Sequence, residues 1–332
     1  MEKCVVIIPA LNEEKTIGQV IDAVPELLFD GHVKLEVVVV NDGSTDQTAK
    51  KAEEHGAFVI YHASPQGVGA SFSAGIREAL RRKADYAVNI DADGQMNPKD
   101  IEKLLKPIVG GVADMVTASR FKDRELIPQM PKVKRWGNNR VAQVISMIVG
   151  RRYYDVSCGF RAYNRETLLR LNLRGKFTYT QETFISLANN DHIRIEEVPV
   201  EIRGEREYGK SRVASSVLKY GIRSGSIILS AFKDYRPIRF FGGLALFFLM
   251  IGIAFETVFL GHYIMYGFFR DYLWAGLIGA FMAVVAMIFF ILMIVSDTLG
   301  KMMKTEEDIL YFSKLQAYYS LKSVDNDMTN CD

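Results

Sequence analysis

Short apolar runs alternate with amphipathic stretches over the first 120 residues of the chain. Five runs are largely apolar and predict β-strands, at residues 5–8, 35–40, 58–61, 86–90 and 115–118. The stretches between them have the apolar spacing of helices, and we expect Asn12 to be the N-cap of the first helix. This alternation predicts an α/β domain with a mostly parallel sheet and helices on both of its faces.

Two much longer apolar segments follow near the C-terminal end. Residues 240–260 contain one charged residue, Glu256, and residues 272–296 contain none. A membrane-spanning helix needs about 20 apolar residues, so the two segments predict a transmembrane hairpin with both flanks on one side. A pair of buried core helices is the alternative, but soluble helices rarely stay apolar on every face over this length.

The pattern divides the chain into four parts. We expect an α/β domain over residues 1–212, amphipathic juxtamembrane helices over 213–239, the transmembrane hairpin over 240–296, and a tail over 297–332. Basic residues cluster before the first span and after the second, which predicts a cytoplasmic domain and a cytoplasmic tail. No basic segment followed by a long apolar stretch opens the chain, so we expect no signal peptide.

Composition narrows the class of protein. The 332 residues include 41 Lys and Arg and 39 Asp and Glu, a net charge of +2, which disfavours a protein that binds nucleic acid through its charge. The three cysteines, Cys4, Cys158 and Cys331, are far apart and form no CxxC pair. We therefore expect no disulfide framework, and a reducing compartment.

Polar residues gather where the predicted strands end. They occupy residues 9–13, 41–46 and 91–95, and ligands of open α/β sheets bind at the carboxyl ends of the strands. Asp91 and Asp93 are two carboxylates one residue apart, suited to Mg²⁺ or Mn²⁺ that shares its other positions with substrate phosphates, and Gln95 adds a neutral oxygen. A solvated loop is the alternative for so short a motif. The chain has no GxxxxGK[ST] phosphate-binding loop.

Several motifs resemble those of family 2 glycosyltransferases. They are residues 5–14 (VVIIPALNEE), 40–46 (VNDGSTD) and 91–95 (DADGQ). Further pieces, together with the hairpin, are similar to the polyprenyl-phosphate glycosyltransferases, the dolichyl-phosphate mannose or glucose synthase group. These pieces are residues 118–121 (ASRF), 155–163 (DVSCGFRAY) and 206–211 (REYGKS).

The resemblance implies a fold and an activity. The fold is a GT-A, Rossmann-like catalytic domain. The activity is the inverting transfer of one sugar from a GDP- or UDP-linked donor to dolichyl or another polyprenyl phosphate, with Mg²⁺ or Mn²⁺ as cofactor. The partners would be the nucleotide sugar, the lipid phosphate and the bilayer, with a homo-oligomer left open. The membrane would be the cell membrane in a prokaryote and the endoplasmic reticulum in a eukaryote.

The resemblance also implies roles for individual residues. Positions that bind the nucleotide correspond to Pro9, Leu11, Glu13, Asp42 and Asp91. The metal site corresponds to Asp91, Asp93 and Gln95. Positions for the acceptor phosphate correspond to Arg120, Arg135, Asn139, Arg206, Lys210 and Ser211, with Asn139 standing where some relatives have Ser. The catalytic set is Asp93, Arg120, Arg135 and Glu182.

The chemistry of the acceptor agrees with this set. A phosphomonoester is largely ionised at neutral pH, with a second pKa of about 6, so it needs cations to hold it more than a general base. Arginine binds phosphate through its two-pronged guanidinium. Two other functions stay open, a processive polysaccharide synthase and a non-catalytic membrane scaffold. The synthases have a QxxRW motif, whereas here PKVK precedes Arg135-Trp136.

Overall fold

A computed structural model of the chain describes residues 1–172, 179–188, 190, 192–204, 225, 229, 233, 236–268 and 270–329. Two compact units make up the chain, one of Met1–Gly225 with Glu307–Asp332 and one of Ser226–Glu306. The predicted amphipathic helices over residues 213–239 lie largely outside the described residues, as do Arg206, Lys210 and Ser211.

One mixed sheet forms the centre of the first unit. Its strands are β1 (Glu2–Ala10), β2 (Leu27–Leu28), β3 (Val33–Asn41), β4 (Phe58–Tyr61), β5 (Tyr86–Asn89), β6 (Met115–Ser119), β7 (Arg161–Asn164) and β8 (Ile195–Pro199). They lie in the order β2-β3-β1-β5-β7-β6-β8, with β4 also pairing with β3. The pairs β1–β3, β1–β5, β3–β4 and β6–β8 are parallel, whereas β7 runs antiparallel to both of its neighbours. The predicted α/β fold is confirmed.

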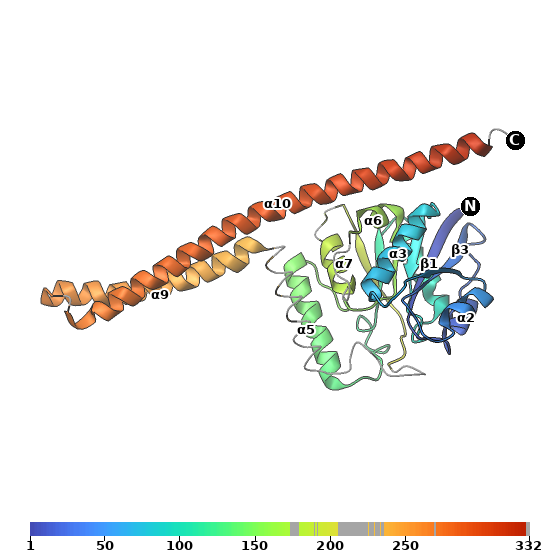
Figure 1. Cartoon of the computed structure of the whole chain (residues 1–332). Coiled ribbons are helices and arrows are strands. Elements are labelled where there is room, and N and C mark those ends of the chain that lie inside the picture. Colours follow the sequence, from blue (N-terminus) through green and yellow to red (C-terminus); the bar gives the residue numbers. More distant parts are fainter. Residues whose placement is uncertain are drawn as a thin grey trace. The chain divides into compact units, whose positions relative to one another are not determined.

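Helices cover both faces of this sheet (Figure 1). The helices of the first unit are α1 (Ile17–Asp22), α2 (Thr48–Glu54), α3 (Val68–Arg81), η1 (Pro98–Asp100), α4 (Ile101–Val109), α5 (Lys132–Val149), α6 (Arg165–Arg170) and α7 (Tyr179–Ala188). On one face, Val6 and Ile8 of β1 share a core with Leu104 of α4. On the other face, Gly75 lets α3 approach β1 so closely that a Cβ there would collide with Ile7. Burial on both faces explains why the run of β1 is continuously apolar.

The prediction that Asn12 caps the first helix is wrong. Helix α1 begins at Ile17, after Thr16. Asn12 has a positive φ of 50°, and its Oδ1 accepts a hydrogen bond from the backbone N–H of Thr45 (2.7 Å). The side chain is therefore used to join the loop after β1 to the loop after β3.

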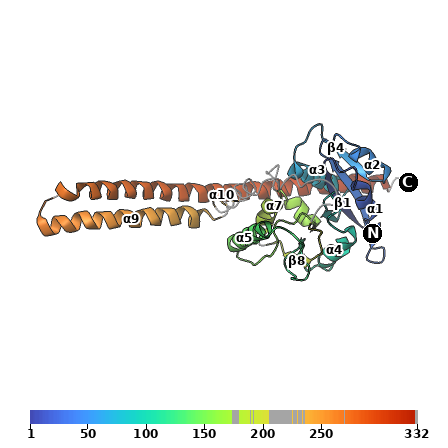
Figure 2. The ribbon, with the colours of Figure 1, turned by 90° about the horizontal axis from the view of Figure 1, so that it is seen from below.

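The second unit contains two long apolar helices. They are α9 (Pro237–Tyr266) and, after the short helix η2 (Arg270–Tyr272), the first part of α10 (Leu273–Thr329), which lies alongside α9 (Figure 2). Both are long and apolar enough to cross a membrane, and most of their side chains are exposed. The predicted span 240–260 lies within α9, and the span 272–296 starts at the last residue of η2 and otherwise lies within α10.

Glycines line the contact between these two helices. A Cβ on Gly252 would lie 3.1 Å from Gly279 O, and a Cβ on Gly276 would lie 3.0 Å from the Phe259 ring. Small residues at such a contact let two apolar helices approach closely in a membrane. These glycines therefore serve packing within one chain.

The C-terminal part of α10 belongs to the first unit. Tyr311 Oη donates to Glu166 Oε2 (2.8 Å), and Lys314 Nζ donates to Leu171 O (2.8 Å). The Arg170 guanidinium lies 4.1 Å from the centre of the Tyr311 ring. The tail is thus attached to the first unit at and just beyond helix α6.

Candidate active site

Three strands end together at one edge of the sheet. Ala10 at the end of β1 pairs with Asn41 of β3, and Ile7 of β1 pairs with Asn89 of β5. The polar segments that follow these strands therefore lie beside one another, as the sequence predicted. Pro9, Leu11 and Glu13 are half-buried at this edge.

Hydrogen bonds join the loops after β1 and β3. The backbone N–H of Asn12 donates to Ser44 Oγ (2.9 Å), and that of Glu13 donates to Thr48 Oγ1 (2.8 Å). Side chains from one loop thus satisfy backbone groups of the other. The loop that contains Leu11 and Glu13 is therefore held in place by the fold itself.

Asp42 is buried, and both oxygens of its carboxylate accept hydrogen bonds from the chain. Oδ1 accepts from Gln66 N (2.9 Å) and pairs with His62 Nδ1 (2.8 Å), while Oδ2 accepts from Gly67 N (2.8 Å). Burial alone would raise the pKa of Asp42, but the hydrogen bonds from His62 and the two backbone N–H groups outweigh it, so the pKa is lowered. Asp42 therefore holds the segment that precedes helix α3 against the site.

The Asp91–Asp93 turn follows β5 and is held from two directions. Asp93 is buried, and its Oδ1 accepts the backbone N–H of Gln95 (3.0 Å). Thr16 Oγ1 donates to Ala92 O (2.8 Å), which ties the turn to the start of α1. Gly94 has a φ of +72°, a conformation that glycine adopts without strain.

Gly159 and Tyr179 border Asp91 on another side. A Cβ on Gly159 would lie 2.9 Å from Tyr179 Oη and 3.3 Å from Asp91 Oδ1, so only glycine leaves this space open. Asn89 Nδ2 donates to Gly159 O and to Tyr179 Oη, both at 2.8 Å. Asn89, Gly159 and Tyr179 were not predicted as site residues, although Asn89 is a polar residue in an apolar run and Gly159 lies in the motif at residues 155–163.

The residues of this turn fit a divalent metal ion. Asp91 and Asp93 are hard oxygen donors, and the open space at Gly159 lies beside the Asp91 carboxylate. Within the described part of the chain, no three His, Cys, Asp or Glu side chains gather to hold a metal. An ion here would therefore need further oxygens from water or substrate, the manner in which Mg²⁺ usually binds with phosphates.

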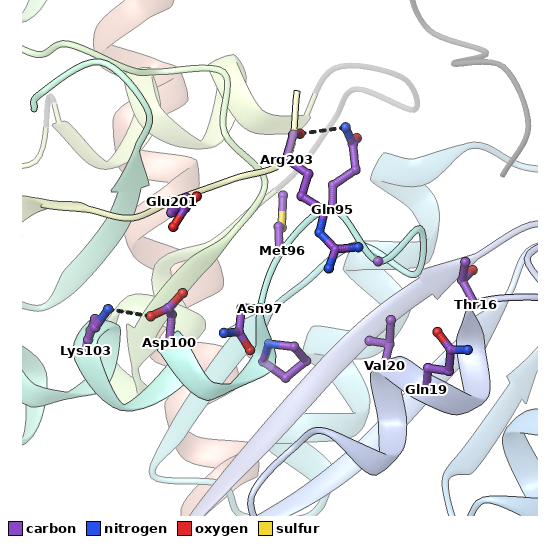
Figure 3. A pocket seen from close by; sticks show the side chains of 12 residues that line it. Thr16, Gln19, Val20, Gln95, Met96, Asn97, Asp100, Lys103, Glu201 and Arg203 are labelled. Carbon is purple, nitrogen blue, oxygen red and sulfur yellow. Dashed lines mark hydrogen bonds and ion pairs between the residues drawn. The ribbon is translucent and has the colours of Figure 1, made fainter. Parts of the chain in front are cut away.

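Gln95 and a neighbouring cavity lie beside the turn. Gln95 Nε2 donates to Arg203 O (2.9 Å), so its amide is turned toward the segment after β8 (Figure 3). The cavity has a volume of about 540 Å³ and is lined by Thr16, Gln19, Met96, Glu201 and Arg203 among others. Asp91 and Asp93 are not among its lining residues, so this cavity neighbours the proposed metal site without containing it.

Arg120 follows β6 and forms a two-pronged ion pair. Its Nε donates to Asp155 Oδ2 (2.6 Å) and its Nη2 to Asp155 Oδ1 (2.9 Å). Burial would raise the pKa of Asp155, but the charge and hydrogen bonds of Arg120 outweigh it and lower the pKa. The backbone N–H groups of Tyr154 and Asp155 both donate to the buried carboxylate of Glu197 (3.0 and 2.8 Å). Arg120 is thus held rigidly.

The remaining predicted residues lie on helices. Arg135 and Asn139 are exposed and four residues apart on α5, so they share one face of that helix. Glu182 is half-buried in the first turn of α7, the helix that begins with Tyr179. Their predicted roles with the acceptor remain predictions.

Comparison with known proteins identifies the family. The family model described as glycosyl transferase family 2 matches residues 5–171. The chain is 31% identical to a UDP-N-acetylglucosamine–dolichyl-phosphate N-acetylglucosaminyltransferase of Methanococcus voltae, covering 58% of this chain and 83% of that protein. It is 30% identical to a polyprenol monophosphomannose synthase of Mycolicibacterium smegmatis, covering 67% of this chain and 88% of that protein.

A solved structure has a similar fold. It is the glucosyl-3-phosphoglycerate synthase of Mycobacterium tuberculosis in complex with Mn²⁺ and UDP-glucose, with a TM-score of 0.52 and 23% identity, covering 70% of this chain and 78% of that one. This likeness supports the GT-A fold. The chain belongs to glycosyltransferase family 2 and is a glycosyltransferase.

Proposed function

We propose that this protein transfers one sugar, with inversion, from a GDP- or UDP-linked donor to dolichyl or another polyprenyl phosphate. The observation that carries the proposal is a family 2 domain with Asp91 and Asp93 at the edge of its sheet, in one chain with two helices apolar enough to cross a membrane. Relatives named for dolichyl-phosphate and polyprenol sugar transfer support the lipid acceptor.

The donor would bind along the edge formed by β1, β3 and β5. We propose that Pro9, Leu11, Glu13 and Asp42 form the wall for the nucleoside. Asp91 and Asp93 would hold Mg²⁺ or Mn²⁺, which would neutralise the charge that develops on the leaving diphosphate. Because Thr16 and the Asp93 side chain already fix this turn, the two carboxylates need little rearrangement to bind the ion.

The acceptor phosphate would be held by cations. Arg120 and Asp155 form a neutral pair, so Arg120 supplies a fixed direction of hydrogen bonding more than net charge. Arg135 on α5, together with Arg206 and Lys210, would supply the net positive charge. The phosphate of the acceptor is already ionised and attacks the anomeric carbon opposite the diphosphate, which inverts the configuration.

We propose that the catalytic domain and the tail lie in the cytoplasm. The contacts of Tyr311 and Lys314 with helix α6 and Leu171 require the domain and the tail to be on the same side of the membrane. Two crossings, by α9 and the first part of α10, satisfy this requirement. The basic residues that flank the hairpin favour the cytoplasmic side.

A product assay tests the proposal. The purified full chain, in detergent, is incubated with Mg²⁺ or Mn²⁺, a panel of radiolabelled nucleotide sugars and a polyprenyl phosphate. We expect labelled sugar in the chloroform phase, released as a single sugar by mild acid, and none with the matching polyprenyl alcohol. An aqueous polymer would support a polysaccharide synthase. Transfer only to a soluble phosphate such as 3-phosphoglycerate would contradict the lipid acceptor, and no product with any donor would support a scaffold.

A further inference from the structure

The orientation of Asn89 can be deduced from its neighbours. Asn89 is fully buried at the end of β5, two residues before Asp91. Its amide nitrogen lies 2.8 Å from Gly159 O, and a carbonyl oxygen can only accept. The atom that faces Gly159 must therefore be Nδ2, which settles the choice between the two amide orientations.

This orientation determines where the hydroxyl proton of Tyr179 points. Asn89 Nδ2 also donates to Tyr179 Oη (2.8 Å), so the hydroxyl accepts on that side and must direct its own proton elsewhere. Tyr179 Oη and both carboxylate oxygens of Asp91 surround one point, the position of a Cβ on Gly159, at 2.9, 3.3 and 3.5 Å. The Asp91 carboxylate and the Tyr179 hydroxyl therefore border the same small space, in which the carboxylate is an acceptor.

The Tyr179 side chain is held in this place by its surroundings. Its ring packs on Phe72 of α3 with 4.6 Å between ring centres. Its backbone carbonyl accepts from Thr183 Oγ1, and Arg161 Nη1 donates to the neighbouring Thr180 O (2.8 Å). Because the first turn of α7 is fixed in this way, the hydroxyl has little freedom to move away from Asp91.

We propose that Tyr179 is a positioning residue for Asp91. Its hydroxyl, oriented by Asn89, donates to the Asp91 carboxylate and holds it toward the metal ion that the proposed function requires. The proposal rests on that function and adds to it the residues that hold Asp91 in place, Tyr179 and Asn89. Groups that hydrogen bond to metal ligands commonly change metal affinity or activity by about 10- to 100-fold when they are removed.

Two variants distinguish this positioning role from a purely structural role of Tyr179. Tyr179→Phe removes the hydroxyl and keeps the ring against Phe72, so it isolates the hydrogen bond from the packing. Tyr163 offers a matched control, since it is also fully buried and its ring also faces Phe72, at 5.8 Å. Tyr163→Phe removes a buried hydroxyl from the same aromatic cluster without touching the Asn89–Tyr179 pair.

The experiment measures Mn²⁺ binding directly. The full chain in detergent is titrated with Mn²⁺ in the presence of UDP or GDP, and free Mn²⁺ is followed by electron paramagnetic resonance. We expect Tyr179→Phe to bind Mn²⁺ at least about 10-fold more weakly than the wild type, and Tyr163→Phe to bind like the wild type. Thermal unfolding of both variants checks that the domain is intact.

A double variant tests whether Asn89 acts through Tyr179. If it does, Asn89→Leu combined with Tyr179→Phe weakens Mn²⁺ binding no more than Tyr179→Phe alone. Wild-type affinity in a folded Tyr179→Phe protein overturns the positioning role and leaves the proposed function intact. Equal losses in the two tyrosine variants also overturn it, because they indicate a general packing effect. A wild type that binds no Mn²⁺ overturns the metal site itself.

Discussion

The side chain of Asp93 combines a negative charge with a hydrogen-bond acceptor, and a single substitution can separate the two. It supplies negative charge beside Asp91, and its Oδ1 accepts the backbone N–H of Gln95 (3.0 Å). Asp93→Asn keeps an oxygen for that hydrogen bond and removes the charge. If the charge holds a divalent ion, we expect transfer to fall by at least about 100-fold while thermal stability changes little. Initial rates with Mg²⁺ and with Mn²⁺, together with a melting curve, measure both effects.

Asp123 provides the control for this substitution. Its Oδ1 accepts the backbone N–H of Glu125 (3.0 Å), the same local geometry in an exposed loop. Asp123→Asn should therefore leave the transfer rate within about 2-fold of the wild type, as surface changes usually do. Equal activity of the Asp93 and Asp123 variants would contradict a metal role for Asp93.

Gly159 gives a second prediction at this scale. A Cβ there would lie 2.9 Å from Tyr179 Oη and 3.3 Å from Asp91 Oδ1. Gly159→Ala must displace one of these groups, at a cost of about 1–3 kcal/mol, and we expect transfer to fall by at least about 10-fold. Gly261→Ala in helix α9 is the matched control, because no atom lies within 4 Å of its added Cβ. Undiminished transfer by Gly159→Ala would show that the space beside Asp91 is not needed.

Some of the residues at the candidate site could be predicted from the sequence, and others could not. Asp91 and Asp93 could be predicted as a site because both lie in one short segment after an apolar run. Asn89, Gly159 and Tyr179 could not, because they come from three segments that only the folded chain brings together. The charge of Arg120 was visible, but its partner Asp155 is 35 residues away, so the neutral pair could not be foreseen.

Among the elements, the segment between α5 and β7 contacts two of the predicted site residues. Asp155 holds Arg120 after β6, and four residues later Gly159 borders Asp91 after β5. The strand β7 that follows inserts antiparallel between β5 and β6. The alternation of strands and helices predicted the parallel pairs, but it did not predict the antiparallel direction of β7. The segment before β7 therefore contacts both Arg120 and Asp91.

Glu197 of β8 gives a prediction about pH. Burial raises the pKa of this carboxyl above the value of about 4.3 of an unfolded glutamate, so the folded protein binds the proton more tightly. Its contribution to stability is then present at low pH and is lost as pH rises through the raised pKa. Glu197→Gln keeps an oxygen that accepts from the N–H groups of Tyr154 and Asp155. Because glutamine does not ionise, the variant does not lose this stability as pH rises.

Thermal unfolding from pH about 4.5 to 8 measures this effect. We expect the stability of Glu197→Gln relative to the wild type to rise with pH across that range. The neighbouring Asp155 has the opposite effect on stability, because its pKa is lowered by folding. Its contribution to stability is lost only below about pH 4, which is outside the range measured. Glu196→Gln, which breaks an exposed pair with Arg151, is the control and should show no such trend. The same pH dependence in the Glu197 variant and the wild type would contradict the assignment.

For the whole molecule, hydropathy predicted two apolar helices but not the contacts that these helices and the tail make. An apolar run shows that a helix can cross a membrane, and both predicted spans lie within long helices. It does not show that Gly252 and Gly279 meet inside one hairpin. Nor does it show that residues 307–332 belong to the same compact unit as the catalytic domain. Both are long-range contacts, which local patterns do not encode.

The topology of the chain gives the last prediction. Cys4 and Cys158 are buried, and burial raises the pKa of both thiols, so neither should react readily with a maleimide. Cys331 near the end of the tail can then report on the tail, and Phe268→Cys, at an exposed position, reports on the link between the spans. A Cys331→Ser background isolates the second reporter.

A membrane-impermeant maleimide is applied to intact cells and to inside-out vesicles. With two crossings and a cytoplasmic domain, Cys331 should be labelled only in inside-out vesicles and the cysteine at position 268 only in intact cells. Labelling of both positions from the same side would mean that the helices do not form a spanning hairpin. Because Tyr311 and Lys314 bind the catalytic domain, labelling of Cys331 from outside the cell would also place that domain outside, away from cytoplasmic nucleotide sugars.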